Sequence, residues 1–529
     1  MRSDTKIQQR PPLKATLGSR QLSGQVDLLI VGGGINGAGI ARDAAGRGLS
    51  VTLVEQDDLA SHTSCSSSKL IHGGLRYLEY YEFRLVREAL IEREVLLRAA
   101  PHIVWPLSFV LPHSPEQRPA WLIRLGLLLY DHLGGRKILP GSTSVDLRRS
   151  GPLGEPLKPW VQRGFTYADC WVEDSRLVAL NALDAAERGA RIRTRTRCER
   201  ARRDGAGWVA DLIDAQGRRS QIRARALVNA AGPWVSTFLE DALGVRSAKR
   251  VRLIKGSHIV VPRLYPGDHP YILQNVDKRI VFVIPFEGAF SLIGTTDVPY
   301  EGDPAAVAIE PAETAYLCAV VNRYFERQIG PGDVVWSYAG VRPLYDDASG
   351  NASAVTRDYV FDLDAGPDRA PLLSVFGGKI TTYRKLAEHA LAKLQPAMGF
   401  VRGAWTASAT LPGGDMPRAD FAAFLAAARR EHPWVPEPLL RRWARAYGTR
   451  LSAIAGAAGR LEDLGCDLGG GLYEAEVRYL VEQEWARTAD DILWRRSRLG
   501  LHVGQDTVAG LEEMLAVGST PALAVAARA

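Results

Sequence analysis

Residues 26–55 read VDLLIVGGGINGAGIARDAAGRGLSVTLVE, and this stretch decides the fold. A short apolar strand leads into Gly32, Gly34 and Gly37, which have G-x-G-x-x-G spacing and open a helical run. A second apolar strand ends in the acid Glu55, about 20 residues after the glycines. This combination is the fingerprint of a βαβ unit that binds a dinucleotide. A glycine turn without a ligand would not explain an acid at that position.

Each part of the fingerprint has a mechanical reason. Gly32 permits the tight turn, Gly34 lets the backbone approach a pyrophosphate, and Gly37 lets the helix pack closely on the sheet. The helix N-terminus offers N–H groups and a positive dipole end to the phosphates. Glu55 can accept hydrogen bonds from a ribose diol.

The composition limits the classes of function. The chain has 529 residues, enough for two or three domains with a large core. A net charge of +7 favours anionic ligands and anionic membrane surfaces, but no aromatic-interleaved basic motif indicates nucleic acid. Five scattered cysteines without C-x-x-C spacing disfavour a disulfide framework or a zinc site, and favour a reducing compartment. We expect no bound metal, and no apolar run has the length of a transmembrane helix.

The pattern along the chain predicts several parts. The polar and basic N-terminus is typical of a disordered extension, the short runs between 236 and 344 indicate strands of a mixed or antiparallel sheet, and the pattern at the end of the chain predicts helices. The boundaries we expect are an extension at 1–25; a unit at 26–400 with cofactor-binding segments at about 26–100, 165–235 and 345–400 and substrate-domain segments at about 101–164 and 236–344; a linker at 401–418; and a helical C-terminal domain at 419–529.

Two stretches allow two interpretations each. Trp121–Leu133 is strongly apolar, and we favour a buried helix over a helix that lies on a membrane surface. Arg191, Arg193, Arg195 and Arg197 alternate, so on a strand they would share one face. We favour a solvated strand face over an anion-binding patch.

A second chemical motif lies at residues 64–79, which read SCSSSKLIHGGLRYLE. The small hydroxyl residues and the glycine pair let the backbone approach a flat ligand closely. Lys69, His72 and Arg76 then supply charge beside that ligand. Apolar residues alternate with the polar ones, which argues against a plain surface loop.

A third motif, Gly377-Gly378-Lys379 with Thr381, opens a helix after an apolar strand. A helix N-terminus stabilises negative charge, such as the N1–O2 edge of a reduced isoalloxazine ring. Lys379 at the turn could reach a substrate phosphate. An ordinary helix start is the alternative.

Two further residues are candidates for substrate contact. His258 follows Lys255 and a glycine in a predicted strand, where a structural role and a substrate contact are equally open. Arg342 lies in GVRPL, which we expect to form a turn, and its planar fork suits a phosphate or a carboxylate. From the residues alone, a surface arginine is the favoured interpretation.

Together these segments resemble the FAD-dependent, quinone-linked glycerol-3-phosphate dehydrogenases of bacterial membranes. The similarity is carried by GGGINGAGIARDAAGRG, SSSKLIHGGLRYLE, NAAGPWV, RLIKGSHIVVP, GVRPL, GGKITTYRKLAE and EVRYLVEQEWARTADDILWRRSRLGL, from about Val26 to Leu501. It implies an α/β fold: an FAD-binding Rossmann-like domain of the glycine-oxidase and D-amino-acid-oxidase type, a mixed-sheet substrate domain and an all-α C-terminal domain.

The resemblance also implies a reaction and a location. Glycerol 3-phosphate is oxidised to dihydroxyacetone phosphate by hydride transfer to FAD, and the electrons pass to ubiquinone. The implied location is a peripheral seat on the cytoplasmic face of the bacterial inner membrane, and a homodimer is left open. The residues themselves leave three alternatives: an amine or amino-acid oxidase, an NAD-dependent dehydrogenase, and a non-catalytic flavoprotein.

Site residues follow from the resemblance position by position. The implied FAD positions are Gly32, Gly34, Gly37, Glu55, Ser67, Ser68, Lys69, Gly73, Gly74, Ala231, Gly232, Gly378 and Thr381. The implied substrate positions are Arg76, Tyr77, Lys255, His258, Arg342 and Lys379. Of these, His258, Arg342 and Lys379 are the expected catalytic group.

Overall fold

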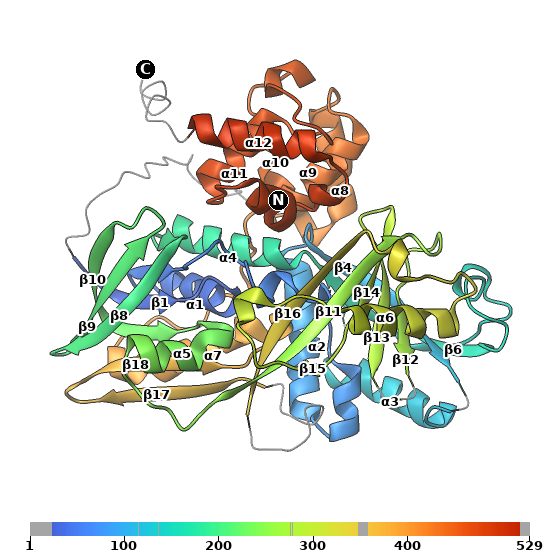
Figure 1. Ribbon diagram of the computed structural model, residues 1–529, viewed down its shortest axis with the longest axis horizontal. Helices are drawn as coiled ribbons and strands as arrows, with labels where there is room; N and C mark the ends of the chain where they lie inside the picture. The colour runs from blue at the N-terminus through green and yellow to red at the C-terminus, as the bar shows by residue number, and fades with distance from the viewer. Residues whose placement is uncertain are drawn as a thin grey trace, which may run out of the picture.

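The computed structural model describes residues 24–114, 116–135, 137–275, 277, 279–346 and 358–518. Two β-sheets with their helices lie beside each other, and a helical domain sits above them (Figure 1). Nearly all of the expected extension at 1–25 lies outside the described residues, and the first strand begins at Gln25.

The first sheet has the strand order β17-β18-β10-β1-β2-β7, with β9 paired to β10 and β8 paired to β9. Its central strands β18, β10, β1 and β2 run parallel, and all four residues of β2 are buried. Both faces of these strands are covered: α1 packs on α4 and α7 on one face, and Trp208 of β9 and Val235 of α5 are buried against the other. The bounds are β1 Gln25–Val31, α1 Ile35–Gly46, β2 Val51–Val54, α4 Asp174–Glu187, β7 Arg191–Arg193, β8 Thr196–Asp204, β9 Gly207–Asp214, β10 Arg219–Asn229, α5 Val235–Thr237, β17 Val360–Gly366, β18 Arg369–Phe376 and α7 Tyr383–Met398.

The second sheet has the order β15-β11-β14-β13-β12-β4-β6-β3, with β16 on β11 and β5 on β6. Its pairs are antiparallel except β12 with β4, so the expected mixed sheet is confirmed. Strands β3 and β6 belong to this sheet, although their residues fall in segments expected in the cofactor-binding part. The bounds are β3 Leu70–Ile71, α2 Phe83–Ala99, β4 Val104–His113, α3 Ala120–Leu133, β5 Thr143–Asp146, β6 Arg163–Val172, β11 Val251–Pro262, β12 Tyr271–Gln274, β13 Ile280–Phe286, β14 Phe290–Gly294, β15 Val298–Pro299, α6 Pro311–Tyr324 and β16 Trp336–Tyr345.

The C-terminal domain is helical, as expected, and has its own core. Leu440, Trp443, Val477, Leu480 and Ile492 are fully buried against one another. Its elements are α8 Phe421–Glu431, α9 Glu437–Tyr447, α10 Leu451–Ala455, α11 Glu474–Gln483, the π-helix η12 Asp491–Arg496 and α12 Gln505–Gly518.

The stretch Trp121–Leu133 forms α3, and the favoured interpretation as a buried helix is wrong. The only buried residues of this helix are Leu127 and Tyr130. Helix α3 lies at the edge opposite the helical domain and packs on α2 and on the 3-10 helix η2, Leu75–Tyr80 (Figure 1). Large apolar side chains of α3 and its neighbours are exposed together: Tyr80, Tyr81, Phe83, Trp121, Leu125, Leu128 and Leu129. We call these seven residues the apolar face.

No helix in the described parts of the chain is both long and apolar enough to cross a membrane. The alternating arginines also differ from expectation. The strand is interrupted at Arg195, whose φ is 50°, so Arg193 ends β7 and Arg197 falls on β8. The favoured single solvated face is therefore wrong, because Arg195 instead pairs with Asp491 of the helical domain at 2.6 Å.

Candidate functional site

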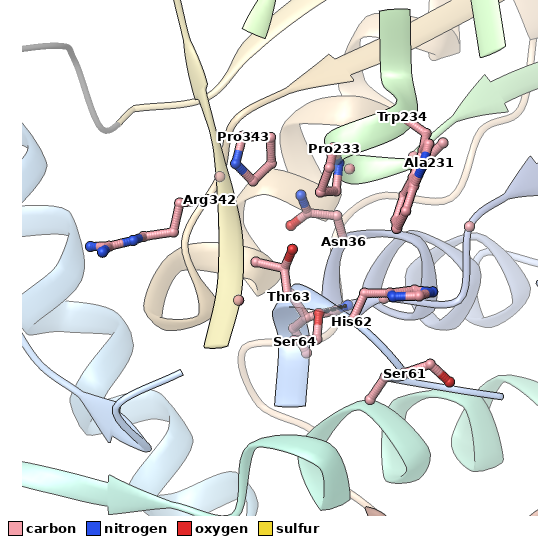
Figure 2. A pocket seen from close by; sticks show the side chains of 18 of the residues that line it. Asn36, Ser61, His62, Thr63, Ser64, Ala231, Pro233, Trp234, Arg342 and Pro343 are labelled. Carbon is pink, nitrogen blue, oxygen red and sulfur yellow. Dashed lines mark hydrogen bonds between the residues drawn. The ribbon is translucent and has the colours of Figure 1, made fainter. Parts of the chain in front are cut away.

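A large cavity of about 610 Å³ lies where the two sheets meet. It is lined by the turns after β1, β10 and β18, by residues 60–64 and 66–68, and by residues of β11 and β16. In Figure 2, Arg342 and Trp234 lie on opposite sides, with Asn36 between them. One end therefore belongs to the first sheet and the other to the second.

The end at the first sheet is a backbone cradle. Gly32 has a φ of 113°, and a Cβ on it would lie 2.4 Å from the oxygen of Ala230. A Cβ on Gly37 would lie 1.9 Å from the oxygen of Gly32, so only glycine allows α1 this close to β1. The N-cap residue of α1, Gly34, has no side-chain cap and lines the cavity. The cradle therefore fits a pyrophosphate at the helix N-terminus.

Glu55 ties the end of β2 to the glycine turn. Its carboxylate accepts hydrogen bonds from the backbone N–H of Gly33 at 2.6 Å and of Asp57 at 2.9 Å. Burial raises the pKa of this carboxyl. Glu55 also lines the cavity, and a carboxylate has further lone pairs for a ribose diol.

Residues 58–69, which we call the cofactor loop, connect the two ends. The Ser64 hydroxyl accepts from the backbone N–H of Ile35 at 3.0 Å, and Thr63 donates to the oxygen of Val341 at 2.6 Å. The loop thus touches α1 and β16 at once. Residues 60–64 and 66–68 line the cavity.

Among the lining residues that sequence reasoning missed, Asn36, His62 and Trp234 make the clearest contacts. The side-chain amide of Asn36 donates to the oxygen of Gly377 at 3.1 Å and so joins two glycine turns. The rings of His62 and Trp234 meet edge to face, with centroids 4.6 Å apart. Trp234 stands in the quoted motif NAAGPWV, whereas nothing in the sequence singled out His62.

His258 stands at the other end, on β11. Its Nε2 atom shares a hydrogen bond of 2.8 Å with the hydroxyl of Ser68, and its ring stacks on Tyr338 with centroids 4.7 Å apart. Burial holds the pKa of His258 well below its usual value, and the charges of Lys69 and Arg342 add to this effect. The imidazole is therefore neutral at pH 7.

Two cations line the same cavity as His258. Arg342 stands on β16, so the expected turn and the favoured surface position are wrong. It donates to the oxygen of Thr296 at 2.7 Å and pairs with Asp297 at 2.9 Å. The ammonium of Lys379 lies 3.8 Å from the ring centroid of Tyr77, within cation–π distance. This end can bind an anion beside a neutral imidazole.

The structure brings most of the predicted site residues together. Those that line the cavity are Gly32, Gly34, Glu55, Ser67, Ser68, Tyr77, Ala231, Gly232, His258, Arg342, Gly378, Lys379 and Thr381. Those outside the described lining are Gly37, Lys69, Gly73, Gly74, Arg76 and Lys255. Gly37 still shapes the cradle through its contact with Gly32.

Two lysines that were predicted to contact a ligand form ion pairs with carboxylates instead. The Lys69 ammonium is fully buried and pairs with Asp174 at 2.9 Å. Lys255 pairs with Glu310 at 2.6 Å and with Glu313 at 2.9 Å. Neither side chain lies on the cavity, because each points to carboxylates outside it.

Comparison with known proteins agrees with this site. The family described as FAD dependent oxidoreductase matches residues 27–384, and the C-terminal domain of alpha-glycerophosphate oxidase matches residues 404–520. The chain belongs to the family of FAD-dependent oxidoreductases. FAD is thus its cofactor, and the alternative of an NAD-dependent dehydrogenase is wrong.

Two relatives of nearly the same length have more specific names than the family. A glycerol-3-phosphate dehydrogenase of Pseudomonas aeruginosa is 59% identical over 483 residues, 91% of this chain and 93% of the relative. A D-erythritol 1-phosphate dehydrogenase of Brucella abortus is 56% identical over 478 residues, 90% of this chain and 95% of the relative. The resemblance inferred from the motifs is confirmed.

Solved structures share the fold. The glycerol-3-phosphate dehydrogenase of Bacillus halodurans, complexed with FAD, is 28% identical, with a TM-score of 0.75 over 93% of this chain and 90% of the other. Glycine oxidase of Geobacillus kaustophilus, 20% identical, has a TM-score of 0.52 over 73% of this chain and 98% of its own. The predicted fold class is confirmed.

Proposed function

We propose that this enzyme oxidises sn-glycerol 3-phosphate to dihydroxyacetone phosphate and passes the electrons to ubiquinone at a membrane surface. The observation that carries the proposal is the set of side chains at the end of the FAD cavity formed by the second sheet. There, the neutral His258 and two cations, Arg342 and Lys379, line the same cavity, and the charge of Arg342 acts on His258. A secondary alcohol next to a phosphate needs this combination of a base and an anion site.

The two cations would hold the phosphate. A guanidinium and an ammonium form strong, charge-assisted hydrogen bonds with phosphate oxygens. Arg342 would exchange its present pairing with Asp297 for part of this contact. Anchoring the phosphate fixes the position of the substrate C2 and lowers the entropic cost of reaction.

The chemistry separates a proton from a hydride. FAD, when bound, supplies the acceptor for the hydride that leaves C2. His258 takes the proton of the C2 hydroxyl, since its neutral imidazole can accept it. The C2–O bond becomes a carbonyl, and the phosphate stays on the two cations.

The names of the relatives support a polyol phosphate as the substrate. Similar identities to a glycerol-3-phosphate and an erythritol-1-phosphate dehydrogenase leave the length of the polyol to experiment. We favour the three-carbon substrate, because the Bacillus halodurans structure is also named for it.

The test is anaerobic addition of sn-glycerol 3-phosphate to the purified yellow holoenzyme. We expect loss of the flavin absorbance, slower or weaker loss with D-erythritol 1-phosphate, and none with glycerol, which lacks the phosphate. Bleaching by glycine or D-alanine, with rapid peroxide formation in air, would support an amino-acid oxidase instead. A flavin that no polyol phosphate bleaches would support a non-catalytic flavoprotein.

In this proposal, the apolar face is the surface that contacts the membrane. Its side chains include Trp121, 68% exposed, and Tyr81, 79% exposed, and the exposed cations Arg87, Arg118 and Lys137 stand near it in the sequence. Aromatic and apolar side chains beside cations fit the surface of an anionic bilayer. The five unpaired cysteines support the cytoplasmic side of the bacterial inner membrane.

Trp121→Asp tests this seat, with Val401→Asp as the control, because Val401 is 90% exposed outside the apolar face. We expect Trp121→Asp to lose binding to phosphatidylglycerol vesicles and ubiquinone reduction in them, while the substrate still bleaches the flavin. Equal binding by both variants would contradict the seat. A change in oligomeric state upon gel filtration would instead assign the face to a second copy of the chain.

A further inference from the structure

The late motif TADDILWRRSRLGL, residues 488–501, forms the part of the helical domain that faces the cofactor loop. Its π-helix η12 carries Arg495 and Arg496, and Arg498 follows two residues later. Two of these arginines are buried: the side chain of Arg496 is 0% exposed and that of Arg498 is 5% exposed. Buried cations need carboxylate partners, and both partners lie at the cofactor loop.

The first partner is Asp58, at the start of the loop. Arg496 donates two hydrogen bonds of 2.8 Å to the two oxygens of its carboxylate, and Arg495 donates a third at 2.8 Å. The backbone of Asp58 in turn holds Ser61: the Ser61 hydroxyl donates to the Asp58 oxygen at 2.7 Å. Ser61 lines the FAD cavity.

The second partner is Asp174, at the start of α4. Its carboxylate binds residues at the end of the cofactor loop. Its fully buried carboxylate accepts from Ser67 at 2.8 Å, from Lys69 at 2.9 Å and from Arg498 at 3.0 Å. Lys69 therefore has a defined place outside the cavity. Arginines of one segment thus contact both ends of the cofactor loop, directly at Asp58 and through Asp174 at Ser67.

A row of aromatic rings makes a third connection. Trp494 stacks on Trp336 with centroids 4.5 Å apart, Trp336 meets Tyr338 at 5.0 Å, and Tyr338 stacks on His258 at 4.7 Å. The Tyr338 hydroxyl also donates to the oxygen of Ser67 at 2.7 Å. The row leads from the helical domain to the substrate end of the cavity.

We propose that the segment Asp491–Arg498 of the helical domain is the clamp that sets the shape of the cofactor loop, so that Trp494, Arg495, Arg496 and Arg498 are positioning residues for FAD. None of them is among the described lining residues, so they act through Asp58, Asp174 and Trp336. FAD binding and the packing of this segment are then coupled, and the coupling is reciprocal.

The first test is the dissociation constant of FAD in Arg498→Met and Trp494→Leu. Arg498→Met leaves the pair of Lys69 and Asp174, so no lone charge is buried. The matched control is Arg450→Met, because Arg450 pairs with Glu187 across the same domain boundary, away from the loop. We expect the dissociation constant to rise at least tenfold in the two variants but not in the control, and to recover in Arg498→Lys and Trp494→Phe. An unchanged constant, or an equal rise in the control, would overturn the proposal.

The second test needs no substitution, so it decides the matter if a variant does not fold. Hydrogen exchange is compared between the wild-type holoenzyme and the same protein stripped of FAD. We expect FAD to slow the amides of residues 491–498 together with those of the cofactor loop, and to leave α10 unchanged. Exchange in 491–498 that is the same with and without FAD would overturn the proposal.

Discussion

The two ends of the cavity are built by different means. At the nucleotide end the contacts come from backbone, and Gly32 and Gly37 occupy places where a Cβ would meet main-chain oxygens at 2.4 and 1.9 Å. At the substrate end, side chains do the work, and His258, Arg342 and Lys379 each contact residues of other elements. An added methyl group should therefore damage the first end most, and a lost charge the second.

The largest expected effect is that of Gly37→Ala. The new Cβ would force α1 away from β1, at a cost of at least ~3 kcal/mol in folding free energy. We expect little or no FAD in the purified protein and a much lower Tm. The control Gly126→Ala has open space around it in α3 and should gain about 0.5–1 kcal/mol. Normal FAD content in Gly37→Ala would remove the distinction between the two ends.

Arg342→Gln comes next. Loss of a charge-assisted contact with the phosphate should cost about 1.5–3 kcal/mol, which lowers kcat/KM for glycerol 3-phosphate roughly 10- to 150-fold. FAD content should be normal. The control is Arg252→Gln, because Arg252 pairs with Asp346 at 2.9 Å and is equally half-buried, but lies outside the described lining. Equal losses in both variants would show that Arg342 serves packing alone.

Lys255→Met tests whether a cation outside the cavity differs in its role from Arg342 and Lys379, which line it. The ammonium of Lys255 neutralises the buried Glu313, so we expect about 2 kcal/mol lower stability and an unchanged KM. Thermal unfolding and steady-state kinetics measure the two quantities. A tenfold higher KM at an unchanged Tm would return Lys255 to the substrate site, as the family resemblance implied.

The smallest expected effect is the pH dependence due to His258. Its folded-state pKa lies well below 6.5, so between that pKa and 6.5 only the unfolded chain binds the proton. With respect to this group, the free energy of unfolding is therefore highest above pH 6.5, where the imidazole is neutral in both states. It falls as the pH drops below 6.5, because protonation then favours the unfolded chain. We expect wild type to lose about 1 kcal/mol relative to His258→Gln between pH 6.5 and 5.5. A difference in unfolding free energy that is constant with pH would mean that His258 has an ordinary pKa.

The nucleotide end could be predicted from the sequence, because its geometry is encoded in closely spaced residues. The fingerprint from Val26 to Glu55 fixed both the turn and the acid. The substrate end could not be predicted in the same way, because ion pairs form between distant residues. Lys255 stands in a site motif, yet its partner Glu310 lies 55 residues further along the chain.

Burial of an apolar helix is likewise decided by its neighbours. Trp121–Leu133 is apolar enough for a core helix, but only Leu127 and Tyr130 of α3 are buried. The arginines of the late motif gave no sign of function in the sequence, because their role depends on Asp58 and Asp174 in another domain. Spacing reveals a local turn, whereas a contact between domains appears only in the fold.

The most direct test of the central claim is a crystal structure of the holoenzyme with dihydroxyacetone phosphate bound. The account predicts phosphate oxygens within hydrogen-bond distance of Arg342 and Lys379, with the C2 carbonyl beside His258 and the flavin ring. A product molecule bound away from these residues, with Arg342 still paired to Asp297, would contradict it.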